Sequence, residues 1–265
     1  IVCSGTGSGK TESFLIPLVD KLVKQWVAEG RPERLSPGVR ALILYPMNAL
    51  VNDQVRRLRR ILREAPFITF GQYVGETAKE SNLPDDFIAK LPGYEKEMLG
   101  AVNETKWDGK LGFDDQAPLA NEHRVRAQWD EPANILVTNY SMLERFLLAP
   151  DTSIIFGDKW KYIILDEAHS YTGAVGTEIA WLMRRIKRRV EANGCPVSEL
   201  RYLATSATLI SDPKLTEEQK AAQIRDDFAT KLFPAGNHSF SVLFGELKQR
   251  PQAPSQFRLT AGQYV

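Results

Sequence analysis

Short apolar runs alternate along this chain with stretches in which apolar residues recur every three or four positions. Residues 41–45 and 162–165 are almost wholly apolar, which is typical of parallel strands covered on both faces. Residues 135–137 and 201–204 predict two further buried strands, and residues 67–74 predict another. These segments indicate a sheet whose strands are separated by longer connections.

Helical spacing fills most of the gaps between the predicted strands. The predicted helices cover residues 11–28, 52–63, a segment through Met142 and Phe146, 176–190 and 215–233. Trp181 is assigned to the apolar core face of the fourth helix, together with Leu182 and Ile186. Because strand and helix alternate, we predict an α/β fold with a mostly parallel sheet and helices on both faces.

Two segments lack this regular pattern. Residues 77–132 contain several prolines and acidic residues with weak periodicity, so we interpret them as an insertion with short helices. The end of the chain carries Pro251 and Pro254, which favours a linker. We therefore divide the chain into a domain of residues 1–211 and a segment, 212–265, of one helix plus linker. Because the chain opens on an apolar strand, we expect it to be a fragment.

Composition narrows the class of protein. With 265 residues, 43% hydrophobic and 25% charged, the chain has the make-up of a soluble globular protein. A net charge of +1 gives no global attraction to nucleic acid or to a membrane. Two cysteines are too few for a disulfide framework or a thiolate zinc site. No apolar run approaches the roughly 20 residues that span a bilayer, so we expect a cytoplasmic protein without membrane contact.

A glycine-rich segment follows the first apolar residues and opens a predicted helix. It consists of Ser4, Gly5, Thr6, Gly7, Ser8, Gly9, Lys10 and Thr11. A phosphate-binding P-loop needs this context, because its backbone N–H groups and the helix N-terminus point at phosphate oxygens. Lys10 would reach the terminal phosphates and Thr11 would ligate Mg²⁺. These residues, with Glu12, are the candidate nucleotide-binding residues; a plain glycine-rich turn is the alternative.

Two carboxylates stand at the end of the predicted strand 162–165. Asp166 and Glu167 open the run Asp-Glu-Ala-His, which ends at His169. The carboxyl edge of a parallel sheet is where ligands bind, so these carboxylates would lie opposite the P-loop. Asp166 would hold Mg²⁺, and Glu167 would orient the attacking water. An acidic turn at a strand end is the simpler alternative.

Together these motifs resemble the first RecA-like domain of superfamily-two DEAD/DEAH-box helicases, nearest the Lhr-like and Hrq-like DNA helicase branch. The order supports this: a P-loop ending in Gly-Lys-Thr, then Tyr-Pro-Met-Asn-Ala-Leu at 45–50, Thr-Asn-Tyr-Ser-Met-Leu at 138–143, the Asp-Glu-Ala-His run, and Thr-Ser-Ala-Thr-Leu at 205–209. Asn48 stands where a basic residue is more common, and Tyr140 replaces a proline.

The resemblance implies further roles. ATP with Mg²⁺ is the expected cofactor, with Lys10, Asp166 and Glu167 as catalytic residues. Coupling of nucleotide state to strand grip would involve His169, Ser206 and Thr208. The expected nucleic-acid contacts are Pro46, Asn48, Gly75, Thr138 and Asn139. The implied partners are single-stranded or tailed DNA, with RNA also open, and a second RecA-like domain beyond residue 265. Association with the nucleoid, and very slow ATP hydrolysis by this segment alone, follow from the same resemblance.

Several interpretations stay open. Arginines on the helices at 52–63 and 176–190 form either a phosphate-binding track or a solvated helix face, and the second is favoured. His169 lacks a second histidine or cysteine at ligand spacing, which favours a hydrogen bond toward Ser206 or Thr208 over a metal. A nucleotide-gated interaction domain without turnover is the alternative function. A P-loop kinase fits less well, because it leaves the Ser-Ala-Thr run unexplained.

Overall fold

A computed structural model describes residues 1–3, 9–75, 119, 121–123, 130–207, 209–210, 212, 214–234 and 240–245. Its centre is an eight-stranded sheet in the order β4-β3-β5-β2-β6-β7-β1-β8, in which neighbouring strands pair in parallel. The strands are β1 Val2–Cys3, β2 Ala41–Tyr45, β3 Phe70–Gln72, β4 Glu122–His123, β5 Ile135–Asn139, β6 Tyr162–Leu165, β7 Arg201–Ser206 and β8 Leu243–Phe244. All carboxyl ends therefore meet at one edge of the sheet.

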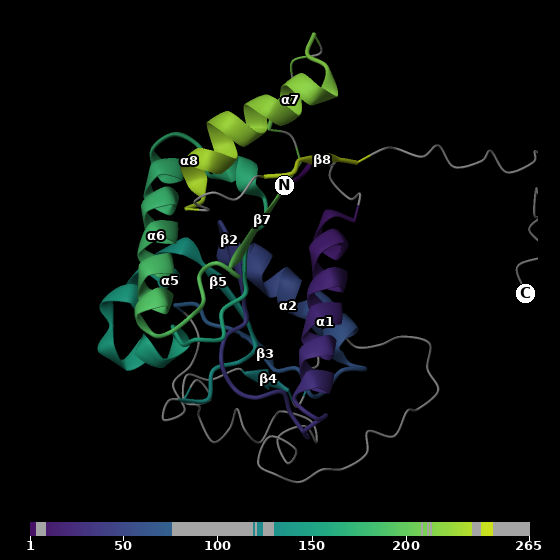
Figure 1. Cartoon of the computed structure of the whole chain (residues 1–265), viewed down its shortest axis with the longest axis vertical. Helices are drawn as coiled ribbons and strands as arrows, with labels where there is room; N and C mark the ends of the chain where they lie inside the picture. Colours follow the sequence, from purple (N-terminus) through teal and green to yellow (C-terminus); the bar gives the residue numbers. More distant parts are fainter. Residues whose placement is uncertain are drawn as a thin grey trace, which may run out of the picture.

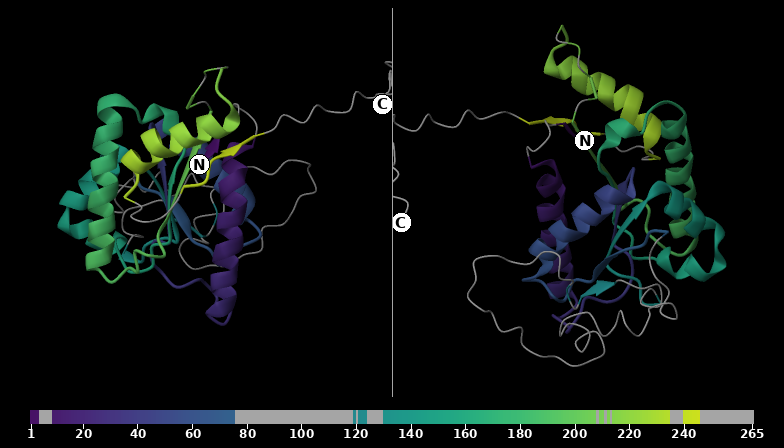
Figure 2. Two further views of the ribbon diagram at one scale, coloured as in Figure 1. Left: turned by 45° about the horizontal axis from the view of Figure 1, so that its top comes forward. Right: turned by 180° about the vertical axis from the view of Figure 1, so that it is seen from behind.

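Helices cover both faces of this sheet, with α1 and α2 on one side and α5 and α6 on the other (Figures 1 and 2). The α-helices are α1 Lys10–Ala28, α2 Asn48–Leu62, α5 Tyr140–Leu148, α6 Gly173–Ala192, α7 Glu217–Gln223 and α8 Thr230–Leu232. Two 3₁₀ turns, η3 Pro150–Ile155 and η4 Ala168–Ser170, and a π-helical stretch, η5 Ile224–Ala229, complete the described elements.

The residues of β2 explain the two layers. Ala41, Ile43 and Tyr45 pack in the core beneath α1 and α2. Leu42 and Leu44 point the other way, into the core beneath α5 and α6. Because successive side chains of a strand alternate between faces, an unbroken apolar strand needs cover on both. The predicted mostly parallel sheet with helices on both faces is confirmed.

Some predicted boundaries and one core assignment are wrong. Helix α2 begins at Asn48, four residues before its predicted start, and β3 is shorter than the strand predicted at 67–74. Trp181 is 64% exposed, although Leu182 beside it is buried. Consecutive residues differ by about 100° around a helix, so Trp181 lies off the apolar stripe that Leu182 and Ile186 share.

Both irregular segments contribute a strand to the sheet. Strand β4 lies within the predicted insertion at 77–132 and pairs with β3; most of that insertion lies outside the described residues. Strand β8 lies in the segment predicted as helix plus linker and pairs with β1. Residues 243–244 are thus part of the sheet rather than of a linker. Residues 246–265, with the two prolines, lie outside the described part.

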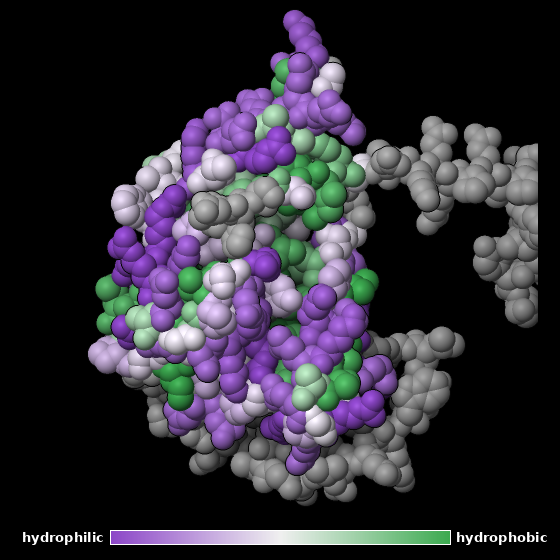
Figure 3. Space-filling model, viewed as in Figure 1, coloured by the Kyte–Doolittle hydropathy of each residue, from purple (hydrophilic) through white to green (hydrophobic). Residues whose placement is uncertain are grey.

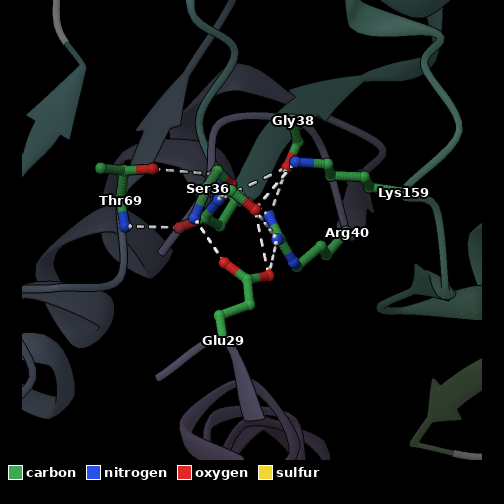
Figure 4. A network of polar contacts seen from close by, with 7 residues as sticks. Glu29, Ser36, Gly38, Arg40, Thr69 and Lys159 are labelled. Atoms are coloured by element: carbon green, nitrogen blue, oxygen red, sulfur yellow. Dashed lines mark hydrogen bonds and ion pairs between the residues drawn. The ribbon is translucent and has the colours of Figure 1, made fainter. Parts of the chain in front are cut away.

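A buried polar network closes the amino-terminal edge of the sheet (Figure 4). Arg40, with only 4% of its side chain exposed, pairs with Glu29 at 2.9 Å and donates hydrogen bonds to the carbonyl and hydroxyl oxygens of Ser36. Asn134 and Thr69 exchange two hydrogen bonds of 3.0 Å between backbone and side chain. Asn134 also donates a hydrogen bond to the Ser36 carbonyl at 3.0 Å, so the loop before β2 is tied to the starts of β2, β3 and β5.

Polar residues cover most of the face drawn in Figure 3, and apolar ones gather below α7, around β8 and the amino terminus. Leu243 in β8 is 61% exposed. Among the helices in the described ranges, not one combines the length and apolarity that a bilayer crossing requires.

Candidate active site

A cavity of about 420 Å³ lies at the carboxyl edge of the sheet, between the first turn of α1, helix α2 and the ends of β2 and β6. Six candidate site residues line it: Gly9, Lys10, Thr11, Glu12 and the Asp166–Glu167 pair that follows β6. The structure therefore brings the described part of the P-loop and both carboxylates to one cavity. Residues 4–8, the rest of the predicted phosphate loop, and Thr208 lie outside the described residues.

The first turn of α1 presents a buried ammonium group to this cavity. Gly9 precedes the helix with φ 80°, a left-handed conformation that glycine adopts without steric cost. Lys10 follows and is only 7% exposed, yet its Nζ has no hydrogen-bond partner. The Glu167 Oε2 atom lies 3.7 Å from Lys10 Nζ. A buried cation without a hydrogen-bond acceptor is suited to an anionic ligand.

Asp166 is held in place by the strand next to its own. Leu165 in β6 pairs with Ala204 in β7, so Asp166 lies beside Thr205. The Thr205 hydroxyl donates a hydrogen bond to Asp166 Oδ1, which also accepts the Glu167 N–H at 2.9 Å. Both Asp166 and Thr205 are almost fully buried. The carboxylate is thereby fixed in one orientation at the wall of the cavity.

Two tyrosines flank the Asp166 carboxylate. Burial raises the pKa of Tyr45 well above its usual value, and the nearby Asp166 carboxylate raises it further. Burial and Asp166 likewise raise the pKa of Tyr171. Both side chains therefore stay neutral, and only Tyr45 lines the cavity.

Glu167 is the second carboxylate, and its backbone is unusual. Its φ of 51° places it in the left-handed region, which non-glycine residues rarely adopt and which often marks functional sites. Its Oε2 lies 3.7 Å from Lys10 Nζ and 3.4 Å from His169 Nδ1. His169 Nδ1 is in turn 3.4 Å from the Ser206 hydroxyl at the end of β7. A continuous polar path thus joins the cavity to the Ser-Ala-Thr run.

The structure gives no support to His169 as a metal ligand. Within the described ranges, no three histidine, cysteine or acidic side chains are grouped closely enough to hold a metal ion. The described neighbours of His169 are a glutamate and a serine, the second of which sequence analysis expected.

Candidate nucleic-acid contacts lie along the same sheet edge. Tyr45 at the end of β2 pairs with Asn139 at the end of β5, which brings the segments that follow them together. Asn139 donates a hydrogen bond to the Asn48 side chain and caps α5 by accepting the Met142 N–H at 2.8 Å. Pro46 and Asn48 are half-buried, and Gly75 is exposed after β3.

Thr138 differs from the other candidates. Its side chain is fully buried, and its hydroxyl donates a hydrogen bond to the Tyr73 carbonyl at 2.5 Å. It occupies an inward position of β5, so in this structure it joins two segments of the fold rather than facing a strand of nucleic acid. The prediction that Thr138 contacts nucleic acid stays a prediction.

Several arginines of α2 are engaged within the fold. Arg59 makes a two-pronged ion pair with Glu122, with both N–O distances at 2.7 Å and the Glu122 side chain 3% exposed. Arg57 lies 3.2 Å from Glu12 at the mouth of the cavity. Sequence reasoning missed both pairs, because the partners are 63 and 45 residues apart.

On α6, basic side chains bind the end of α8. Arg184 donates a hydrogen bond to the Lys231 carbonyl at 3.2 Å, and Lys187 donates one to the Pro234 carbonyl at 3.0 Å. Cations stabilise helix C-termini because the last carbonyls lack helical partners. These two residues therefore favour the structural interpretation of the second basic cluster.

Comparison with known proteins adds to this geometry. The family model described as DEAD/DEAH box helicase matches residues 1–86 and 102–216. The chain belongs to the DEAD/DEAH box helicase family. The resemblance drawn from the motifs is thereby confirmed.

Curated relatives in this helicase family are much longer than this chain. Druantia protein DruE of Escherichia coli is 30% identical, and the match covers 96% of this chain and 17% of DruE. ATP-dependent helicase hrq1 of Schizosaccharomyces pombe is 26% identical, over 80% of this chain and 15% of that protein. ATP-dependent helicase Lhr-Core of Methanocaldococcus jannaschii is 26% identical, over 71% of this chain and 18% of that protein. The chain thus spans less than a fifth of each.

Solved helicase structures share the fold. DUF1998 helicase MrfA bound to DNA superposes with a TM-score of 0.55 at 20% identity, covering 92% of this chain and 23% of that one. DEAD-box helicase Mss116 bound to ssRNA and UDP-BeF also gives a TM-score of 0.55, at 16% identity, covering 92% of this chain and 35% of that one. The predicted RecA-like fold class is confirmed.

Proposed function

We propose that this chain is the first motor domain of a DNA helicase or translocase, and that it binds Mg²⁺·ATP in the cavity at the carboxyl edge of the sheet. The observation that carries this proposal is the convergence of Lys10, Thr11, Asp166 and Glu167 on that one cavity. Sequence segments more than 150 residues apart supply a cation, a hydroxyl and two carboxylates to the same space. This is the set that phosphoryl-transfer sites of P-loop enzymes use.

The residues present fit the nucleotide and its metal. The Lys10 ammonium is buried without a hydrogen-bond acceptor, as a phosphate-binding group would be. Thr11 and Asp166 offer a hydroxyl and a carboxylate, the oxygen donors that Mg²⁺ prefers. So few protein ligands suit Mg²⁺, which usually keeps several waters and binds substrate phosphates. When bound, the metal would neutralise charge that develops on the phosphates.

The chain's own groups then have distinct tasks. Lys10 stabilises phosphate charge, and Asp166, fixed by Thr205, holds the metal side of the nucleotide. Glu167 accepts a hydrogen bond from the attacking water and orients it toward the terminal phosphate. Because Glu167 also contacts His169, a change at the terminal phosphate is relayed to Ser206. Thr208 would take part in the same relay.

The nucleic acid would lie along the segments that carry Pro46, Asn48, Gly75 and Asn139. Support comes from their shared sheet edge and from the Asn48–Asn139 hydrogen bond, which joins two of the segments. DNA rather than RNA is proposed from the Lhr-like motifs, and MrfA is a structural neighbour solved with DNA. A second RecA-like domain would complete the binding track and the ATP site, and the full protein would act on single-stranded or tailed DNA at the nucleoid.

Two substitutions test the assignment of roles. Lys10→Ala should weaken Mg²⁺·ATP binding, because it removes charge that acts in the ground state. Glu167→Gln should leave binding nearly intact and abolish hydrolysis in the full-length protein, because it affects the water in the transition state. Lys24→Ala is the matched control: it lies on the same helix, 65% exposed and paired with Asp20. Binding is measured with a fluorescent ATP analogue and hydrolysis by phosphate release.

Equal loss of nucleotide affinity in Lys10→Ala and Glu167→Gln would show that the roles are assigned wrongly. Loss of affinity in Lys24→Ala as large as in Lys10→Ala would show that binding is not in this cavity. For the strand contacts, Asn48→Ala should weaken binding of labelled single-stranded DNA without changing nucleotide affinity.

A further inference from the structure

One wall of the cavity carries two polar side chains to which no role has been given above. They are Tyr45, the last residue of β2, and Gln54 in the middle of α2. Gln54 is the one polar residue among the buried residues of α2, whose other buried members are Val51, Val55, Leu58 and Leu62. A carboxamide in an apolar stripe costs free energy unless it is hydrogen-bonded.

Neither side chain meets that condition in the described structure. Gln54 is 7% exposed and its Oε1 has no hydrogen-bond partner, while the hydroxyl of Tyr45, a residue 1% exposed, faces the Asp166 carboxylate outside good hydrogen-bond geometry. Lys10 Nζ, on the opposite wall, is a third buried polar atom in the same condition. Three such groups around one cavity point to a ligand that supplies hydrogen-bond donors as well as acceptors.

Chemistry distinguishes what the two walls can bind. Lys10 can only donate, so it suits phosphate oxygens. Gln54 Oε1, the carboxamide atom left without a partner, is an acceptor and is satisfied by an N–H or O–H donor. Water molecules on Mg²⁺ are such donors, and Mg²⁺ gives up its waters reluctantly. The Tyr45 hydroxyl, close to the Asp166 carboxylate, can both donate and accept.

We infer that Tyr45 and Gln54 are metal-side positioning residues of this cavity: Gln54 accepts a hydrogen bond from the hydration shell of Mg²⁺, and Tyr45 bridges that shell to Asp166. The inference rests on the proposed nucleotide site. It also gives α2 a double role, because Asn48 at the start of this helix carries the proposed strand contact. Gln54 lies six residues further along the same helix, so hydrated Mg²⁺ and the nucleic acid would both contact α2.

The test separates metal dependence from packing. Affinity for a fluorescent ATP analogue is measured with Mg²⁺ and with EDTA for the 265-residue chain, for Gln54→Leu and for Tyr45→Phe. The measured quantity is the ratio of the affinity with Mg²⁺ to the affinity in EDTA. Each variant should lower this ratio by about twofold to tenfold, which corresponds to one net hydrogen bond. The affinity in EDTA should be unchanged. The urea midpoint of Gln54→Leu should be unchanged or higher, because the substitution removes a buried oxygen atom without a partner.

Gln25→Leu is the matched control. Gln25 Oε1 is also buried without a partner, but the residue lies on α1 outside this cavity. Substitution of Gln25 should not change the increase in ATP-analogue affinity that Mg²⁺ provides. The inference is overturned if Gln54→Leu and Tyr45→Phe keep the wild-type gain, or if they lose affinity equally with Mg²⁺ and EDTA. If the wild-type chain itself shows no Mg²⁺-dependent binding, the proposed function fails instead.

Discussion

The hydrogen bond from Thr205 to Asp166 permits a quantitative prediction. Both residues are buried, at 1% and 3% exposure, and the acceptor is a carboxylate. Thr205→Val keeps the shape of the side chain and removes the donor. A hydrogen bond to a charged group contributes about 1.5–3 kcal/mol, so the free energy of unfolding should fall by about 2 kcal/mol. For a chain of this size that corresponds to a Tm lower by roughly 4–8 °C.

Thr205→Ser is the control, because it keeps the hydroxyl and loses one methyl group. Burial of one such group is worth about 0.8 kcal/mol, so the serine variant should be the more stable of the two. Urea denaturation followed by tryptophan fluorescence measures the difference. The valine variant should also bind nucleotide more weakly than the serine variant in the presence of Mg²⁺, because only the valine variant loses the hydrogen bond to Asp166. A valine variant as stable as the serine variant would refute the reasoning.

Three further predictions concern the scaffold. Glu122→Gln should lower the free energy of unfolding by about 3 kcal/mol, because the Glu122 carboxylate, 3% exposed, makes two charge-assisted contacts of 2.7 Å with Arg59 that a neutral amide keeps only in part; urea titration measures this, and a loss below about 1 kcal/mol, the value of an exposed ion pair, would contradict it. Gly176→Ala should also destabilise, by about 1–3 kcal/mol, because its Cβ would lie 2.6 Å from the Tyr171 carbonyl oxygen; a stabilised variant would show that helix propensity outweighs the clash. Burial lowers the pKa of His123 from 6.5 to about 4, so the folded chain binds fewer protons than the unfolded chain between those values. Stability should therefore fall as pH drops from 6.5 toward 4, and His123→Gln should flatten that slope in urea titrations at pH 7 and pH 5.

The sequence predicted the structure best where a residue pattern is compatible with only one type of secondary structure. Strands β2 and β6 occupy the predicted residues, because a run of apolar residues flanked by polar ones fits only a strand covered on both faces. The P-loop and the carboxylate pair were predictable for a related reason. Both follow buried strands, and parallel strands end at one edge.

Other features depend on contacts between distant segments. The two-residue strands β4 and β8 carry too little pattern to be recognised, and their pairing depends on neighbours in the sheet. Gln54 could not be assigned to the cavity, because its position on α2 becomes meaningful only once β2 and α1 are placed around it. The exposure of Trp181 was missed because large aromatic residues are usually assigned to cores.

The Arg40 network at the opposite edge of the sheet has a mechanical consequence. It joins the segments that precede β2, β3 and β5, through the Arg40–Glu29 ion pair, the reciprocal Thr69–Asn134 hydrogen bonds and a hydrogen bond from Asn134 to the Ser36 carbonyl (Figure 4). The proposed ligand-binding groups all lie at the other ends of the strands. Forces exerted at the carboxyl edge by a nucleotide or a moving nucleic-acid strand would therefore act on a sheet whose amino-terminal edge is held fixed. Amide hydrogens next to Arg40 and Asn134 should exchange among the slowest in the chain, and those after β2 and β5 should exchange sooner.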